Sequence, residues 1–310
     1  MADEKRRREF NVDFMGKTRA AVAFTVILTV GALIALSVRG LNLGIDFTGG
    51  TLVELGYEQP ADLAAVRSAL DASEFDGAGV QRFGSDTDVL VRLPPTDADA
   101  SAAGLGDRIL SVLPGAQMRR VEFVGPQVGD ELIEDGMLAL IYALGGILVY
   151  VMVRFTLKFS VGAIVATVHD VLVTVGFFAV TGMEFDLTVL AAVLAVIGYS
   201  LNDTIVVFDR IRENFRRLRK DDAKEVINRS LNQTLSRTLT TSGTTLLVVI
   251  ALFLFGGELI HGFSAALIVG IVIGTYSSIY VASAMLVGLR VSKVDLMPIN
   301  KEDTAVDQRP

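Results

Sequence analysis

A carboxylate inside an apolar segment is the first feature of this sequence that could do chemistry. Asp203 lies in the apolar stretch 185–208, beside Asn202. A charged side chain in a membrane helix costs roughly 2.5–3.5 kcal/mol on insertion scales, and such residues commonly mark proton or ion relays. Alternatively, water could reach Asp203 about two helical turns before Arg210. We expect Asp203 to pass protons, and Asn202 to hydrogen-bond Asp203 or a neighbouring helix.

A cation stands where the apolar stretch 238–257 begins. Arg237 could hold Asp203 ionised until a proton arrives. It could equally be an anchor whose long side chain reaches the membrane surface. The stretch is also rich in hydroxyl groups at 240–245, which could bond locally to the preceding turn or line a hydrated path. The residues alone leave these alternatives open.

A second ionisable pair, His169 and Asp170, lies about ten residues into the apolar stretch 159–183. One of them could relay protons, since histidine titrates near physiological pH. Both could equally be buried hydrogen-bonding groups that tie helices together. Neighbouring residues on a helix point about 100° apart, so we expect the two side chains not to face one target.

Six apolar blocks must position these residues. The chain has 310 residues, of which 51% are hydrophobic and 20% charged, and it contains no cysteine. Blocks of about 20 apolar residues cross a hydrocarbon core of about 30 Å. The sequence therefore predicts a polytopic α-helical membrane protein and excludes an ordinary soluble enzyme. The six predicted transmembrane helices are 20–38, 136–153, 159–183, 185–208, 238–257 and 262–289.

The distribution of lysine and arginine predicts the orientation. If the N-terminus is inside, only seven of the 28 Lys and Arg residues fall outside. Positive residues concentrate on the cytoplasmic side of membrane proteins. We therefore expect 1–19, 209–237 and 290–310 in the cytoplasm and 39–135 outside, with residues 40–134 in the periplasm of a bacterial inner membrane protein.

The outside segment has the pattern of a small soluble domain. Residues 40–134 hold 16 Asp and Glu against 6 Arg. Strands are predicted at 50–57, 80–83, 89–93 and 118–124, and helices at 60–73 and 97–113, the first opening at Pro60. The order βαββαβ is typical of an α+β ferredoxin-like domain.

Two glycine-containing segments connect this domain to the spans. They are Asp46, Phe47, Thr48, Gly49 and Gly50 before it, and Gly125, Pro126 and Gly129 after it. Glycine adopts backbone angles that other residues avoid, so the simplest interpretation is a turn feeding a strand and a hinge-like connector. Because both segments tether the domain to the membrane, they could also transmit motion.

Small residues recur at every fourth position of the last span, at Gly262, Ala266, Gly270, Gly274, Ser278 and Ala282. Such a stripe lets helix backbones approach closely, either within the chain or against a partner.

The segment 210–229 is basic and amphipathic, with Ile211, Phe215 and Leu218 at helical spacing. This pattern predicts a helix on the membrane surface, attracted by anionic lipids. It has no aromatic platform for nucleic acid. Gly16-Lys17-Thr18 resembles the end of a phosphate loop, but Asn11 replaces the required glycine, so we expect no nucleotide binding.

Four segments carry a resemblance to a known family. They are residues 43–50, residues 123–129, residues 198–214, which run from Gly198 to Asn214, and residues 237–242. Together they resemble the SecD/SecF family of protein-export membrane subunits, within it the SecF branch, and through it the RND superfamily. The resemblance extends over about residues 10–290, without departure at the motif positions.

The resemblance implies an accessory subunit of the Sec translocase. With SecD, such a subunit uses the proton gradient to promote late stages of protein export, and Asp203 is implicated in proton passage. The implied partners are SecD, the SecYEG channel, an exported unfolded polypeptide, a membrane insertase, small accessory subunits and membrane lipids. We expect no enzymatic activity, no cofactor, no metal site, no nucleic acid and no nucleotide.

Two other functions stay open. A proton-driven RND-type exporter of small molecules or lipids would need a ligand cleft, for which an outside domain of this size offers little room. A non-transporting scaffold of the translocon would tolerate neutralisation of Asp203 and Arg237.

Overall fold

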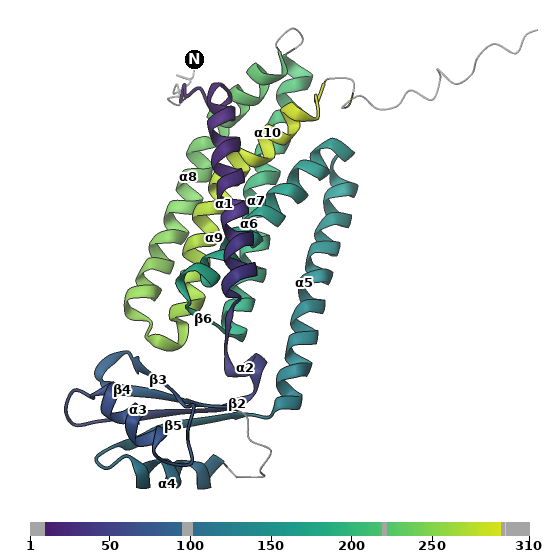
Figure 1. The fold of residues 1–310 in the computed structure, drawn as a ribbon. Helices are drawn as coiled ribbons and strands as arrows, with labels where there is room; N and C mark the ends of the chain where they lie inside the picture. The colour runs from purple at the N-terminus through teal and green to yellow at the C-terminus, as the bar shows by residue number, and fades with distance from the viewer. Residues whose placement is uncertain (1–9, 95–101, 219–221, 293–294, 296–310) are drawn as a thin grey trace, which may run out of the picture.

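The computed structural model describes residues 10–94, 102–218, 222–292 and 295. Within them, six helical segments are long and apolar enough to cross a membrane, as the sequence predicts. The segments run side by side, and a small domain lies beyond one end of the bundle (Figure 1). We call that end the domain side and the other end the opposite side. The segments are α1 (Thr18–Arg39, preceded by the 3-10 turn η1, Met15–Lys17), α5 (Pro126–Arg154), α6 (Leu157–Thr181), α7 (Leu187–Arg217), α8 (Ala223–Phe255), and α9 (His261–Ile279) with α10 (Val281–Gly288), preceded by η2 (Glu258–Ile260).

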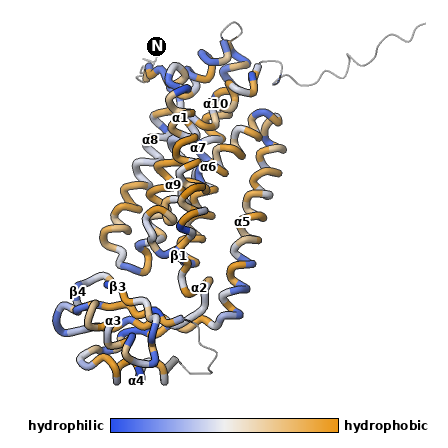
Figure 2. The backbone as a smooth tube through the Cα atoms, viewed as in Figure 1, coloured by the Kyte–Doolittle hydropathy of each residue, from blue (hydrophilic) through white to orange (hydrophobic). Residues whose placement is uncertain are grey.

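Three of the six segments form the centre of the bundle. In α6, in α7 and in the segment of α9 and α10, 56% of the apolar window is buried, against 11% in α1 and α5 and 17% in α8. Figure 2 shows hydrophobic residues along most of α1, on the part of α5 away from the small domain and on the part of α8 nearest to it. Asp170 of α6 and Asp203 of α7 lie in this interior, while α1, α5 and α8 offer apolar surface to lipid or to a partner.

The stripe of small residues packs within the chain, against α7. A Cβ atom at Gly270 would overlap the side chain of Val196, and one at Gly274 would lie 3.0 Å from Ser200 Cβ. Similarly, a Cβ atom at Gly176 of α6 would overlap Ala32 of α1. Small residues thus bring α9 close to α7 and α1 close to α6.

The small domain has the predicted ferredoxin-like order. Its sheet has the strand order β3-β4-β2-β5, with every neighbouring pair antiparallel. Its elements are β2 (Gly50–Gly56), α3 (Leu63–Asp71), β3 (Gly79–Phe83), β4 (Ser85–Leu93), α4 (Ala102–Val112) and β5 (Gln117–Val124). The first helix starts at Leu63 rather than at Pro60, because the Asp62 side chain accepts from the Ala64 and Ala65 amides and caps it. The first residues of the helix predicted at 97–113 lie outside the described residues.

The second connector forms the start of a helix. Gly125 is the N-cap of α5, and Pro126 occupies the first helical position, ten residues before the predicted span at 136–153. The fixed φ of proline suits a first turn, so the chain enters the helix directly from β5. Hinges can lie at the ends of helices, so the hinge-like interpretation of this connector stays a prediction.

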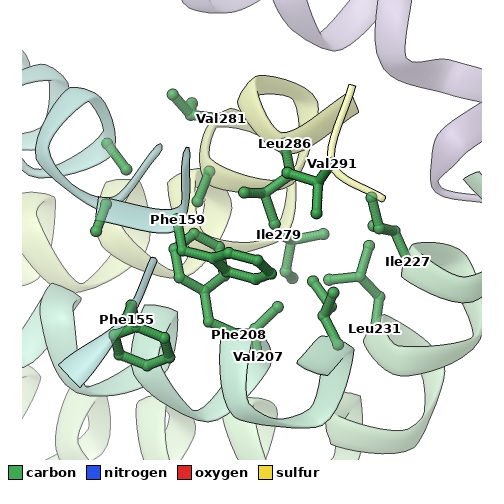
Figure 3. Close-up of a cluster of buried hydrophobic side chains, with 14 of the residues drawn as sticks. Phe155, Phe159, Val207, Phe208, Ile227, Leu231, Ile279, Val281, Leu286 and Val291 are labelled. Carbon is green, nitrogen blue, oxygen red and sulfur yellow. The ribbon is translucent and has the colours of Figure 1, made fainter. Parts of the chain in front are cut away.

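The basic segment does not lie flat on the membrane. It is built from the end of α7 and the start of α8, on either side of residues 219–221, which are not described. Ile211 and Phe215 are buried in a cluster with Phe155, Phe159 and Phe208, part of which Figure 3 shows. Its apolar positions fill the protein interior, because an amphipathic pattern serves a packed helix as well as a surface helix.

Gly270 and Gly198 offer a matched test of the close packing between helices. Gly270→Ala places a methyl group against Val196, whereas Gly198→Ala meets nothing within 4 Å. We expect Gly270→Ala to destabilise the purified chain by about 1–3 kcal/mol through overpacking. We expect Gly198→Ala to be neutral or to stabilise by about 0.5–1 kcal/mol. Thermal unfolding followed by circular dichroism in detergent measures both, and equal midpoints would contradict the close packing of Gly270 against Val196.

Candidate functional site

Asp170 lies at the centre of a polar cluster that joins three helices. Its carboxylate is fully buried on α6. Asp170 Oδ2 accepts hydrogen bonds from Ser200 Oγ of α7 and from Ser277 Oγ of α9, the latter at 2.6 Å. The other oxygen, Oδ1, lies 2.9 Å from His169 Nδ1. Two serine hydroxyl groups and one histidine ring therefore surround the buried carboxylate of Asp170.

His169 and Asp170 contact each other, so the expectation that they face different targets is wrong. Their Cβ atoms leave the helix in different directions, but the length of the imidazole lets its ring bend back to the neighbouring carboxylate. His169 is only 4% exposed. Its Nε2 atom is buried and has no hydrogen-bond partner among the described residues. The pair thus combines a titratable ring and a carboxylate in one buried place.

Asp203 is also buried inside the helix bundle, on α7. It is 3% exposed, and Ser242 Oγ of α8 lies 3.4 Å from Asp203 Oδ2. Thr275 Oγ1 of α9 lies in turn 2.8 Å from Ser242 Oγ. Since Thr275 and Ser277 are two residues apart, α9 serves both carboxylates. Asp170 is therefore bonded by hydroxyl groups of α7 and α9, whereas Asp203 is bonded by one hydroxyl group of α8 that α9 supports.

Arg237 and Asn202 are not in contact with Asp203. Both side chains are exposed, and neither an ion pair nor a hydrogen bond joins either of them to Asp203 within the described chain. Adjacent residues point about 100° apart, so burial of Asp203 turns Asn202 outward. The exposure of Arg237 fits the interpretation as a membrane-surface anchor. Without a direct contact, Arg237 acts on Asp203 only through longer-range electrostatics.

The hydroxyl groups of α8 divide into two kinds. Thr244 and Thr245 donate to the carbonyl oxygens of Thr240 and Thr241, one turn earlier, which is local bonding. Ser242 alone among the residues 240–245 is buried. The sequence pointed to a hydroxyl-rich helix but not to Ser242 in particular, and it gave no prediction for Ser277. Only the tertiary packing selects these two.

The first glycine motif connects the domain to the start of α7. Asp46 belongs to the one-turn helix α2 (Ile45–Thr48), and its Oδ2 atom accepts from the Leu187 amide at 2.9 Å. Asp186 accepts from the Val189 amide at 2.8 Å. Two carboxylates therefore cap one helix, where they satisfy free amides and complement the helix dipole. Phe47 packs beside them, against Phe185.

The glycines of both motifs allow close approach between backbones. A Cβ atom at Gly49 would lie 2.9 Å from Pro126 Cα, and one at Gly129 would lie 3.0 Å from the Phe47 carbonyl oxygen. Gly50 has φ +124°, and a Cβ atom there would lie 2.5 Å from the Leu93 carbonyl oxygen. The two connectors are thus packed against each other at the base of the domain.

A strand pair and an ion pair complete the junction. The two-residue strand β1 (Asn42–Leu43) pairs in parallel with β6 (Glu184–Phe185), which lies between α6 and α7. Arg92 of β4 donates to the Leu43 carbonyl oxygen at 2.5 Å and forms an ion pair with Glu184 at 3.5 Å. Burial raises the pKa of Glu184, helped by the charge of Asp186 and, less, of Asp46, and opposed by Arg92 and by a Gln81 hydrogen bond.

These features define a class of protein: a polytopic membrane protein whose buried carboxylates lie in a helix bundle, which a closely packed junction joins to a small α+β domain. The match to family models is more specific. The model described as "Protein export membrane protein SecD/SecF, C-terminal" matches residues 107–292, and the model "SecD/SecF GG Motif" matches residues 34–61. The chain belongs to the SecD/SecF family.

Named relatives and a solved structure agree with this assignment. The chain is 50% identical to protein translocase subunit SecF of Vibrio alginolyticus, over 98% of each chain. It is 52% identical to protein translocase subunit SecF of Pseudomonas aeruginosa, over 96% of this chain and 98% of the relative. The crystal structure of SecDF, a translocon-associated membrane protein from Thermus thermophilus, superposes with a TM-score of 0.83 at 40% identity. That similarity covers 93% of this chain and 40% of the SecDF chain.

Ser277 and Ser278 test the hydrogen bond to Asp170. Ser277 donates to the buried carboxylate, whereas Ser278 donates to carbonyl oxygens of its own helix. We expect Ser277→Ala to destabilise the chain by about 1–2 kcal/mol, as for strong interhelical hydrogen bonds in membrane proteins. The neighbouring Ser278→Ala removes only a hydrogen bond within its own helix, so it serves as the control and should destabilise the chain less. Equal effects of the two variants in detergent unfolding would argue against a stabilising contact at Asp170.

Glu184 predicts a pH dependence of stability. Because its pKa is raised in the folded chain, the folded state binds this proton more tightly than the unfolded state. The resulting stability is fully present below the ordinary glutamate pKa of about 4.3 and is lost as the pH rises through the raised value. Glu184→Gln stays neutral, so its unfolding temperature should rise relative to the wild type as the pH increases across this window.

The exposed Glu58→Gln variant is the control for the general effect of replacing a carboxylate by an amide in the same domain. A constant difference for Glu184→Gln would show that Glu184 titrates as an ordinary surface carboxyl.

Proposed function

We propose that this chain is an accessory subunit of the Sec translocase that, with SecD, uses the proton gradient to promote late stages of protein export. The names of its relatives and the SecDF structure support this function. The distribution of lysine and arginine supports an orientation with the opposite side in the cytoplasm and residues 40–134 in the periplasm of a bacterial inner membrane protein.

The observation that carries the proton coupling is the pairing of buried carboxylates with hydroxyl groups. Asp170 and Asp203 are bonded mainly by serine, and no arginine or lysine is in ion-pair contact with either within the described residues. A hydroxyl group donates to an ionised carboxylate and can accept from a protonated one. Each carboxylate can therefore change its protonation state without leaving a buried polar group unpaired, which would cost about 1–3 kcal/mol.

A change of protonation at Asp170 would act on three helices at once. Ser200 and Ser277 would have to rotate their hydroxyl hydrogens when the carboxylate becomes a donor, and the contacts of α6 with α7 and α9 would be rearranged. Each proton that crosses the membrane supplies about 2.3 kcal/mol per 100 mV. This energy is sufficient to bias two packings of the helices that differ by a few kcal/mol.

The junction on the domain side would pass this change to the periplasmic domain. The loop between α6 and α7 pairs with β1 and holds Arg92 of the sheet through Glu184. Asp46 caps α7 itself. Because the connectors are packed and not slack, a shift of α6 or α7 would move the domain as a rigid body. We propose that this movement acts on the exported polypeptide.

The remaining site residues have proposed roles at the surface of the bundle. Arg237 would act on Asp203 through space, and its effect would grow when a partner excludes water. Asn202 is exposed on the outside of α7, so any part that it takes in proton passage would depend on SecD covering this surface. The SecYEG channel, a membrane insertase and small accessory subunits are proposed partners on the same grounds of family membership.

Replacement of either buried carboxylate tests the proposal. We expect Asp203→Asn and Asp170→Asn each to slow the export of a slow-folding secreted substrate in cells by at least about tenfold, because the amide cannot take up or release a proton. Asp222→Asn removes a carboxylate from the exposed start of α8 and should leave export unchanged. Pulse-labelling of the precursor and the mature substrate measures the rate.

Each variant must be produced at the wild-type level and must co-purify with SecD. Slow export from an intact complex would place the carboxylates in the energy-coupling step. Normal export by both variants would reject proton coupling through them and would favour the scaffold function.

A further inference from the structure

A basic cleft lies on the opposite side of the bundle, where α5 and α7 end. It has a volume of about 420 Å³, which falls within the range of small-ligand sites. Its lining combines four arginines with two carboxylates, so that positive charge is in excess. The lining residues are Arg154, Asp209, Arg212, Glu213, Arg216 and Arg217.

Packing holds two of these guanidinium groups in place. The guanidinium groups of Arg154 and Arg212 both lie over the Phe155 ring, at 5.2 and 5.1 Å from its centre. Asp209 accepts from Arg154 at 2.9 and 3.0 Å. Arg212 donates to the Arg154 carbonyl oxygen at 3.2 Å. The two cations are therefore pre-organised, although each repels the other.

The carboxylates leave part of this positive charge unpaired. Glu213 is shared between Arg210 at 2.6 Å and Arg217 at 2.8 Å. Arg216 is exposed and has no carboxylate partner within the part of the chain that the structure describes. In addition, the Nε atom of Arg212 is buried without a hydrogen-bond partner among the described residues. A donor left unpaired in a buried place is costly unless a ligand uses it.

A phosphate group has the chemistry to complete the cleft. Arginine binds phosphate oxygens through its planar fork of donors, and two or three guanidinium groups can surround one dianionic or monoanionic phosphate. The arginines of the cleft are contributed by two helices, so a phosphate would also bridge α5 and α7.

The surface beside the cleft indicates a lipid as the source of the phosphate. The last turns of α5 expose apolar side chains directly next to Arg154, with Met152 45% and Val153 85% exposed, and Leu157 at the start of α6 is 72% exposed. Anionic lipid headgroups bind in basic pockets between helix ends at the cytoplasmic surface of a membrane. The acyl chains of such a lipid would cover this apolar face.

We propose that the cleft lined by Arg154, Arg212 and Arg216 binds the phosphate headgroup of an anionic phospholipid whose acyl chains lie along the exposed end of α5. The site lies at the membrane boundary and uses none of the buried carboxylates. It requires only that α5 and α7 cross the bilayer, so its test is independent of proton coupling.

Titration of the purified full-length chain with phosphatidylglycerol in detergent, read by native mass spectrometry, tests the site. We expect Arg216→Gln to weaken binding about fivefold, the effect of one arginine near an anionic lipid. Arg212→Lys keeps the charge but removes the fork of donors, and it should weaken binding by a similar factor. Arg229→Gln removes an exposed arginine from α8 and should change binding less than twofold.

Two further arms distinguish the source of the phosphate. Phosphatidylcholine should bind more weakly, since its headgroup has no net charge, and inorganic phosphate should bind more weakly because it lacks acyl chains. If inorganic phosphate binds as tightly as phosphatidylglycerol, the ligand of the cleft is a soluble anion and the lipid proposal is overturned. If Arg216→Gln and Arg229→Gln lose the same affinity for phosphatidylglycerol, the binding is general electrostatic attraction, and the proposal of a specific site is overturned. Loss of SecD association in Arg216→Gln, with unchanged lipid binding, would assign the cleft to the partner instead.

Discussion

The burial of a carboxylate in an apolar helix bundle sets the conditions for the rest of this structure. Asp170 needs hydrogen-bond donors in a place that water does not supply, and it receives them from α7 and α9. Those donors are short serine side chains, which reach the carboxylate only if the helix backbones lie close together. Gly274 lies directly against Ser200 and permits this approach. The stripe of small residues and the polar cluster are therefore one structural feature, because the first makes the second possible.

The same logic applies where the bundle meets the domain. Asp46 and Asp186 satisfy the free amides at the start of α7, and the glycines of the two motifs bring the two connectors into contact. The domain is therefore attached to the bundle through capped helix ends and closely packed backbones. The ion pair between Arg92 and Glu184 adds a contact whose strength depends on pH, at the point where β4 meets the loop between α6 and α7.

Features determined by local sequence could be predicted, whereas features determined by tertiary packing could not. Block length and periodicity predicted the six membrane helices and the βαββαβ order, and a charge in an apolar block identified Asp203. The contact between His169 and Asp170 depends on a side-chain rotamer, and the role of Ser277 depends on which face of α9 meets α6. The prediction of a surface helix at 210–229 failed for another reason. An amphipathic pattern is the same whether its apolar face contacts lipid or the buried cluster that contains Phe155.

The choice of partners for the two carboxylates favours exchange of protons over a purely structural role. A scaffold would gain more stability from apolar side chains of similar volume, because buried charges lose more solvation than their pairing returns. An arginine partner would hold a carboxylate permanently ionised, whereas serine and threonine accommodate both protonation states. Arg237 is exposed, and the side chain that bonds Asp203 is Ser242. Within the described residues, His169 is the one titratable side chain in contact with Asp170. The bundle keeps two buried carboxylates, Asp170 and Asp203, although burying them costs free energy. The hydroxyl groups beside them can either donate or accept a hydrogen bond, which suits carboxylates that bind and release protons.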